Sequence, residues 1–129
     1  MADHHVLATG SRGYQHRSAM WTTLDRVHAA RPITLLGIGG CYSETPGGIP
    51  FLRGADLFAF EWAIKHSVPC LVLSADWDQF GKSAGPRRDA KLVPLVKPQT
   101  VVAAPGGTGT RNMVERCRAA GAEVVEVDR

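Results

Sequence analysis

Residues 105–110, Pro-Gly-Gly-Thr-Gly-Thr, have the composition of an anion-binding loop. They follow an apolar run and precede a stretch with helical spacing. Glycine lets the backbone approach a ligand closely and turn its N–H groups inward, and a helix N-terminus attracts negative charge. The alternative is a tight strand–helix turn without a ligand, which needs fewer glycines than the three present. We expect the whole segment to contact an anionic group: Pro105, Gly106, Gly107, Thr108, Gly109 and Thr110.

Two further segments contain residues that recognise phosphate. In Gly10-Ser11-Arg12, the glycine permits a turn, the serine can donate to an oxygen, and the arginine can bind in bidentate fashion. An ordinary turn with a solvated arginine fits the same three residues. Arg88 is expected in the first turn of a helix, where a cation is unfavourable unless an anion lies nearby. A solvated Arg88 is the competing interpretation.

Asp56, Asp76 and Trp77 are candidates for contacts with the rest of a ligand. Asp56 begins a predicted helix, where an acidic residue is stabilising in any case. The alternative is that it holds a ribose hydroxyl. Trp77 can stack on a base or pack against its own loop. Gly39 and Gly40 end the second apolar run and are expected to let the backbone approach the ligand.

Several familiar motifs are absent from the sequence. Gly81-Lys82-Ser83 resembles the end of a Walker A loop, but the first glycine of that motif would fall at Asp76. No dinucleotide-binding glycine motif follows the first apolar run. Cys41 has no histidine near it in the sequence, and the histidines lack metal-ligand spacing. We therefore predict neither a metal site nor a cofactor.

Five short apolar runs alternate with four segments of helical spacing. The runs are residues 6–9, 33–38, 70–75, 100–104 and 123–127, and the helical segments are 17–30, 55–66, 86–93 and 111–120. Pro94 is expected to end the third helix, and residues 39–53 form a loop rich in glycine and proline. Continuously apolar strands are typical of a parallel sheet covered on both faces. The sequence thus predicts a Rossmann-like, doubly wound α/β sandwich of three layers.

This fold predicts where the ligand binds. Ligands of doubly wound sheets lie beyond the carboxyl ends of the strands, so the expected site consists of loops 10–12, 39–40, 75–85 and 105–110. We expect residues 1–129 to form one domain with a loop insertion at about 41–53. The helix at 55–66 is apolar nearly all round, which indicates a place in the core and in a subunit interface.

Composition narrows the class of protein further. The chain has 129 residues, of which 44% are hydrophobic and 21% charged, as in a soluble globular domain. No leader sequence or membrane span is recognisable, and the three cysteines favour a reduced, cytoplasmic protein. A net charge of +3 without a basic stripe favours a small anionic ligand over nucleic acid.

The order of these segments resembles one branch of a known superfamily. Gly-Ser-Arg (10–12), Gly-Gly (39–40), Gly-Ala-Asp…Glu-Trp-Ala (54–63), Ala-Asp-Trp…Gly-Lys-Ser-Ala-Gly-Pro-x-Arg (75–88) and Pro-Gly-Gly-x-Gly-Thr-x-x-Met (105–113) are similar to the YspA-like, cpYpsA-related branch of the SLOG superfamily. The likeness extends over about residues 6–127. That superfamily joins the DprA/Smf proteins and the LOG phosphoribohydrolases. The resemblance implies a nucleotide or nucleotide-derived ligand, a phosphate at residues 105–110 and a homodimer or higher homo-oligomer.

The departures from LOG enzymes bear on catalysis. LOG enzymes have a catalytic glutamate three residues after the loop threonine, and here that position is Met113. Glu115 lies about 200° further round the helix and cannot replace it. Arg88 matches, but Asp89 stands where asparagine is usual, Ile38 stands where histidine is usual, and loop 41–53 is longer.

Three functional hypotheses follow. The first is a module that binds a nucleotide derivative for sensing, sequestration or processing. The second is an enzyme that cleaves a nucleotide N-glycosidic bond, with Arg88 and Asp56 as catalytic candidates and Asp76 as another possible carboxylate. The third is DprA-like binding of single-stranded DNA. The intact loops without the LOG glutamate favour the first.

Overall fold

The computed structural model describes residues 3–40, 52–75 and 77–127, with only the backbone of Trp77 and Asp78. Its centre is a parallel five-stranded sheet in the order β3-β2-β1-β4-β5. The strands are β1 (His5–Thr9), β2 (Leu35–Gly40), β3 (Cys70–Ser74), β4 (Thr100–Ala103) and β5 (Glu123–Glu126). The expected parallel sheet is confirmed.

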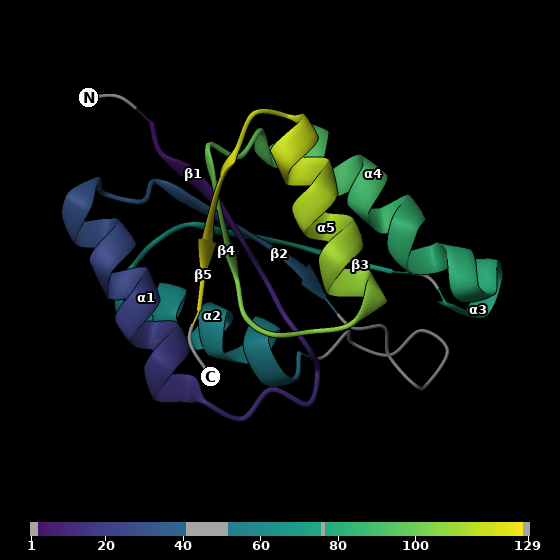
Figure 1. Ribbon diagram of the computed structural model, residues 1–129, viewed down its shortest axis with the longest axis horizontal. Coiled ribbons are helices and arrows are strands. Elements are labelled where there is room, and N and C mark those ends of the chain that lie inside the picture. Colours follow the sequence, from purple (N-terminus) through teal and green to yellow (C-terminus); the bar gives the residue numbers. More distant parts are fainter. Residues whose placement is uncertain (1–2, 41–51, 76, 128–129) are drawn as a thin grey trace.

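Helices cover both faces of this sheet. They are α1 (Arg17–Ala30), α2 (Gly54–Lys65), α3 (Trp77–Phe80), α4 (Ala84–Val96) and α5 (Thr108–Ala119), with the 3₁₀ helix η1 (Gly81–Ser83) between α3 and α4. Figure 1 shows α1 and α2 on one face of the sheet and α4 and α5 on the other. The predicted three-layer Rossmann-like sandwich is therefore confirmed.

The central strand β1 contributes to both halves of the core. Val6 and Ala8 pack into the apolar layer under α1 and α2, whereas Leu7 packs into the layer under α4 and α5. All three side chains are fully buried. Burial on both faces explains why the run at residues 6–9 shows no polar alternation.

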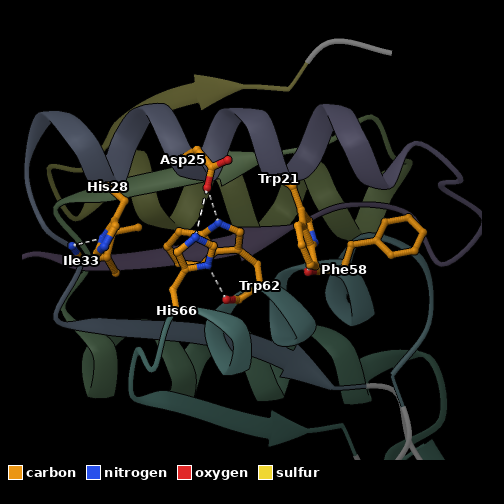
Figure 2. A network of polar contacts seen from close by, with 7 residues as sticks. All are labelled: Trp21, Asp25, His28, Ile33, Phe58, Trp62 and His66. Carbon is orange, nitrogen blue, oxygen red and sulfur yellow. Dashed lines mark hydrogen bonds and ion pairs between the residues drawn. The ribbon is translucent and has the colours of Figure 1, made fainter.

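Hydrogen bonds from two tryptophans fix α2 against α1. The indole Nε1 of Trp62 donates to Asp25 Oδ1 at 2.8 Å, and that of Trp21 donates to the Phe58 carbonyl, also at 2.8 Å. Figure 2 shows both indoles between the two helices, with His66 stacked on Trp62. These contacts hold α2 in a fixed position on its face of the sheet. Its N-terminal turn is thereby held near the carboxyl ends of the strands.

The prediction that Pro94 ends the third helix is wrong. The helix begins earlier, at Ala84, and continues through Pro94 to Val96. Pro94 removes one backbone hydrogen bond in the last turn, but Val96 is fully buried against the sheet and keeps that turn in place. Lys97, with a φ of 51°, closes the helix by donating its N–H to the Val93 carbonyl at 2.8 Å.

Three other boundaries differ from the prediction. Gly39 and Gly40 are the last residues of β2 and not part of a loop. The predicted loop at 75–85 contains α3 and η1. The helix expected from residue 111 begins at Thr108, so half of the glycine-rich segment is its first turn. Of the expected insertion at 41–53, residues 41–51 lie outside the described part of the chain.

Among the described residues, no helix combines the length and apolarity that crossing a membrane requires.

Candidate functional site

The strand order reverses between β1 and β4, and the two loops that follow these strands touch. Chain connections proceed from β1 through β2 to β3 on one side, and through β4 to β5 on the other. The N–H of Ser11 donates to the Pro105 carbonyl at 3.0 Å, which joins the loop after β1 to the loop after β4. A reversal of this kind is where doubly wound sheets bind their ligands.

A cleft of about 470 Å³ opens at this edge of the sheet. Its volume is within the range of small-molecule sites. Eleven of the residues predicted from the sequence line it: Gly10, Ser11, Arg12, Gly39, Gly40, Asp56, Arg88, Gly107, Thr108, Gly109 and Thr110. Pro105 and Gly106 do not line it. Asp76 and the side chain of Trp77 lie outside what the structure describes.

The cleft also contains residues that the sequence analysis did not name as candidates. They are Thr9, Lys82, Gly85, Pro86, Asp89, Asn112 and Met113. Lys82 and Gly85 belong to the loop at 75–85, which was expected at the site, but Gly81-Lys82-Ser83 was examined there only as a Walker A motif. Met113 is buried and occupies the position where LOG enzymes have their glutamate. The described carboxylates of the cleft are therefore Asp56 and Asp89.

The glycines of the loop at 105–110 serve different purposes. A Cβ at Gly106 would collide with the side chain of Thr110, so the fold itself requires glycine there. A Cβ at Gly107 or Gly109 would meet no atom within 4 Å, and the φ of Gly107, −95°, is not in the left-handed region that favours glycine. The packing of the described residues therefore gives no reason for glycine at these two positions. Both line the cleft.

The N-terminal turns of three helices line the same cleft. Asp56 belongs to the first turn of α2, Gly85 and Pro86 to that of α4, and Thr108 to that of α5. No side-chain hydrogen bond caps α2 or α5, whose N-cap residues are Arg53 and Gly107. Each helix N-terminus contributes a partial positive charge. Together they favour an anion in the cleft.

Arg88 is held in place by groups on β2 and α4. Its Nη1 donates to the Gly40 carbonyl at 2.9 Å, and its Nε donates to Asp89 Oδ1 at 2.6 Å. The guanidinium lies against Gly39, where a Cβ would be 2.6 Å from Cζ. These contacts use two of its five N–H donors. The rest of the guanidinium remains available to a ligand in the cleft.

Asp89 connects this arginine to the helix of the glycine-rich loop. It is 1% exposed, and its Oδ2 accepts a hydrogen bond from Asn112 Nδ2 on α5 at 2.9 Å. One carboxylate thus bridges Arg88 on α4 and Asn112 on α5.

Asp56 is half-buried in the cleft, and its acidity is strongly altered. Burial, the largest cause, and the charge of Asp89 together raise the pKa of its carboxyl to about 8, against the opposing effects of Arg88 and Arg12. At neutral pH the group is therefore mostly a neutral carboxylic acid. In that form it can donate a hydrogen bond or a proton.

The cysteines of the described chain are poor nucleophiles. Burial raises the pKa of the Cys70 thiol to about 11 and that of Cys117 to about 12, with Asp89 adding to the second shift. Cys41 is outside the described residues. Across residues 3–40, 52–75 and 77–127, no group of three or more His, Cys, Asp or Glu side chains is arranged to hold a metal ion.

The fold and the cleft define a Rossmann-like α/β protein with a strand-end site between β1 and β4. No protein-family model matches the sequence. The chain is 30% identical, over 128 residues, to the Gene 61 protein of Mycobacterium phage D29, and the alignment covers 93% of each chain. The chain belongs to the same family as this phage protein.

Proposed function

We propose that the protein binds a nucleotide or nucleotide-derived anion in the cleft between β1 and β4. The observation on which this proposal depends most is the pair Gly107 and Gly109. Both line the cleft at the N-terminus of α5, and nothing within 4 Å of either would obstruct a side chain. At a helix N-terminus, backbone N–H groups that no side chain covers can donate hydrogen bonds to a phosphate group.

The side chains of the cleft support the same ligand class. Arg12, Lys82 and Arg88 line it together with Asp89, and Asp56 is mostly neutral at pH 7. The net charge of the cleft lining is therefore positive, although the net charge of the whole chain is no more than +3. The cleft volume of about 470 Å³ has room for a base and a sugar as well as a phosphate.

We further propose that the protein is a member of the SLOG superfamily, in its YspA-like branch, and acts in the cytoplasm to sense, sequester or process its ligand. The support is the sequence resemblance, whose segments at 10–12, 39–40, 88 and 107–110 all line one cleft. Single-stranded DNA is the third candidate ligand from the sequence, and tight, salt-dependent binding of an oligonucleotide would favour it over a mononucleotide.

One incubation tests the binding proposal. Near-stoichiometric purified protein is mixed with a panel of nucleoside monophosphates, nicotinamide nucleotides and ADP-ribose derivatives and then filtered, and both fractions are analysed by HPLC. We expect an intact nucleotide in the retained fraction. Gly107→Asp, which places a carboxylate at the N-terminus of α5, should abolish retention. Ala119→Asp places the same group at the exposed far end of α5 and should not. Equal retention by both variants would contradict the proposal.

Cleavage of an N-glycosidic bond is the second candidate function, and Asp56 is the observation that favours it. A neutral carboxylic acid beside Arg88 can protonate a departing base while the arginine holds the phosphate, and a water molecule then bonds to C1′ of the sugar and returns a proton to the carboxylate. In this case free base appears in the filtrate. Asp56→Asn should then stop base release while nucleotide retention persists. Glu115→Gln, on an exposed position of α5, is the matched control.

We also propose a homodimer or higher homo-oligomer that uses α2. The side chain of Ile64 is 64% exposed, whereas Ala59, Trp62 and Ala63 of the same helix are buried. Light scattering coupled to gel filtration should give a multiple of 13.9 kDa for the wild type and a smaller mass for Ile64→Lys. An unchanged mass for the variant would contradict a role of α2 in assembly.

A further inference from the structure

We propose that Asp89 is a positioning residue, which fixes the Arg88 guanidinium against β2 and couples it through Asn112 to the helix of the glycine-rich loop. The benefit to ligand binding rests on the proposed function. The positioning itself follows from contacts within the described chain.

Asp89 divides its two oxygens between two helices. Oδ1 accepts from Arg88 Nε at 2.6 Å and Oδ2 accepts from Asn112 Nδ2 at 2.9 Å. With the bond from Arg88 Nη1 to the Gly40 carbonyl, the guanidinium is held at two of its three nitrogens. An arginine held in this way loses little conformational freedom when a ligand binds.

Electrostatics alone does not explain a carboxylate at this place. A negative charge beside an anion-binding arginine weakens the attraction of the cleft for an anion. Burying an ion pair also costs desolvation energy, which its mutual attraction repays only in part. Asp89 is 1% exposed and Arg88 is largely buried, so both costs apply. The gain from orienting the guanidinium offsets these two costs, because a correctly placed arginine binds phosphate in bidentate fashion.

The chemistry of the pair gives a sharp test. Asp89→Ala removes both acceptor oxygens, so Arg88 and Asn112 lose their hydrogen bonds to residue 89. Asp89→Asn keeps the shape without the charge, because its amide oxygen can accept from Arg88 Nε and its amide N–H can donate to Asn112 Oδ1 once the Asn112 amide turns over. Both variants remove the same negative charge, so the net charge of the protein is equal in the two.

The first measurement needs no ligand. The Nε–H resonance of Arg88 is followed by ¹⁵N NMR in the intact protein, with its hydrogen exchange. We expect a protected signal in the wild type, loss of protection in Asp89→Ala, and retention of protection in Asp89→Asn. Protection that is equal in all three proteins would overturn the positioning role. Thermal unfolding of each variant shows whether a lost signal reflects a misfolded chain, and Glu115→Gln controls for loss of a carboxylate elsewhere.

The second measurement uses adenosine 5′-monophosphate and inorganic phosphate as probes in calorimetric titrations. We expect Asp89→Ala to weaken binding about tenfold and Asp89→Asn to keep most of the affinity. Tighter binding by Asp89→Ala, as its more positive cleft alone would give, would overturn the inference. A wild type with a protected Arg88 signal that binds neither these probes nor any nucleotide of the panel would refute the proposed function and still support the positioning of Arg88 by Asp89.

Discussion

The guanidinium of Arg88 lies directly on the backbone of Gly39. A Cβ at residue 39 would lie 2.6 Å from Cζ of the arginine and 2.7 Å from its Nη1, which is far inside van der Waals contact. Gly39 is in β2 and Arg88 in α4, on the face of the sheet covered by α4 and α5. The absence of a side chain on the strand is therefore what lets the arginine reach the Gly40 carbonyl.

Gly39→Ala should displace the arginine and leave the fold intact. The end of a long side chain can move away from a new methyl group, but the hydrogen bond to Gly40 and the ion pair with Asp89 are then distorted. We expect phosphate or nucleotide affinity to fall about tenfold and stability to fall by about 1–3 kcal/mol. Calorimetric titration and urea unfolding measure the two effects. Gly13→Ala, where a Cβ meets only Ser11 Oγ at 3.7 Å, should change neither.

Gly107→Ala and Gly109→Ala should both lower anion affinity, and the exchange at residue 109 should at the same time raise stability. Neither methyl group meets another atom within 4 Å, and alanine at residue 109, inside α5, should stabilise the helix by up to about 1 kcal/mol. Anion affinity should fall, because the methyl groups point into open space that the ligand is proposed to use. Urea unfolding with and without phosphate separates the two effects. Gly106→Ala is the contrast and should lower stability through its collision with Thr110.

Asp56→Asn should stabilise the protein progressively as the pH rises. The pKa of Asp56 is about 8 in the folded chain and close to 4 when unfolded. Between these values the folded state holds one proton more, so the stability of the wild type falls with rising pH. The variant loses this dependence. Unfolding curves should coincide near pH 4 and differ most above pH 8. A constant difference across that range would contradict the raised pKa.

The affinity for an anion should also depend on whether the carboxyl of Asp56 is protonated. A ligand anion near Asp56 prefers the neutral acid, so affinity should be highest below about pH 8 and fall above it. Asp56→Asn should bind with no such fall. Affinity is measured against pH with inorganic phosphate and with sulfate. Sulfate has no titration of its own in this range, so the comparison distinguishes the titration of Asp56 from that of the ligand.

Trp62→Phe should cost more stability than Trp21→Phe. Both indoles donate one hydrogen bond at 2.8 Å between α1 and α2, but Trp62 is fully buried, whereas Trp21 is half-buried. We expect a loss of about 2 kcal/mol for the first and about 1 kcal/mol for the second, from the lost bond and the space left behind. Denaturant unfolding measures both. Equal losses would show that burial of Trp62 adds nothing.

Much of the fold follows from the sequence, because the strands are short, apolar runs between helical segments. Helix α1 has the predicted boundaries, Arg17–Ala30. The end of α4 could not be predicted from Pro94 alone, because the burial of Val96 depends on a sheet built from distant parts of the chain. A residue such as proline predicts the end of a helix only when tertiary packing does not outweigh its local effect.

The residues of the site also divide into those that the sequence predicts and those that it does not. Glycines and charges at strand ends are visible in the sequence, and the residues expected at 10–12, 39–40, 88 and 107–110 do line one cleft. Asp89 and Asn112 lie in helices, where polar residues usually face water. The burial of Asp89 and its contact with Asn112 depend on how α4 packs against α5, which no local pattern shows.

The pairing of β1 with β4 has a consequence for how the protein acquires its site during folding. Val6 aligns with Thr100, 94 residues further along the chain, and the contact between Ser11 and Pro105 extends this pairing beyond the strands. Parallel pairing over such a separation forms slowly, because a long loop must close first. An incompletely folded chain therefore has no complete cleft, and the anion proposed to bind there would join the two halves of the sheet. Ligand should accordingly slow the unfolding rate and protect the amides of β1 and β4 from hydrogen exchange most strongly.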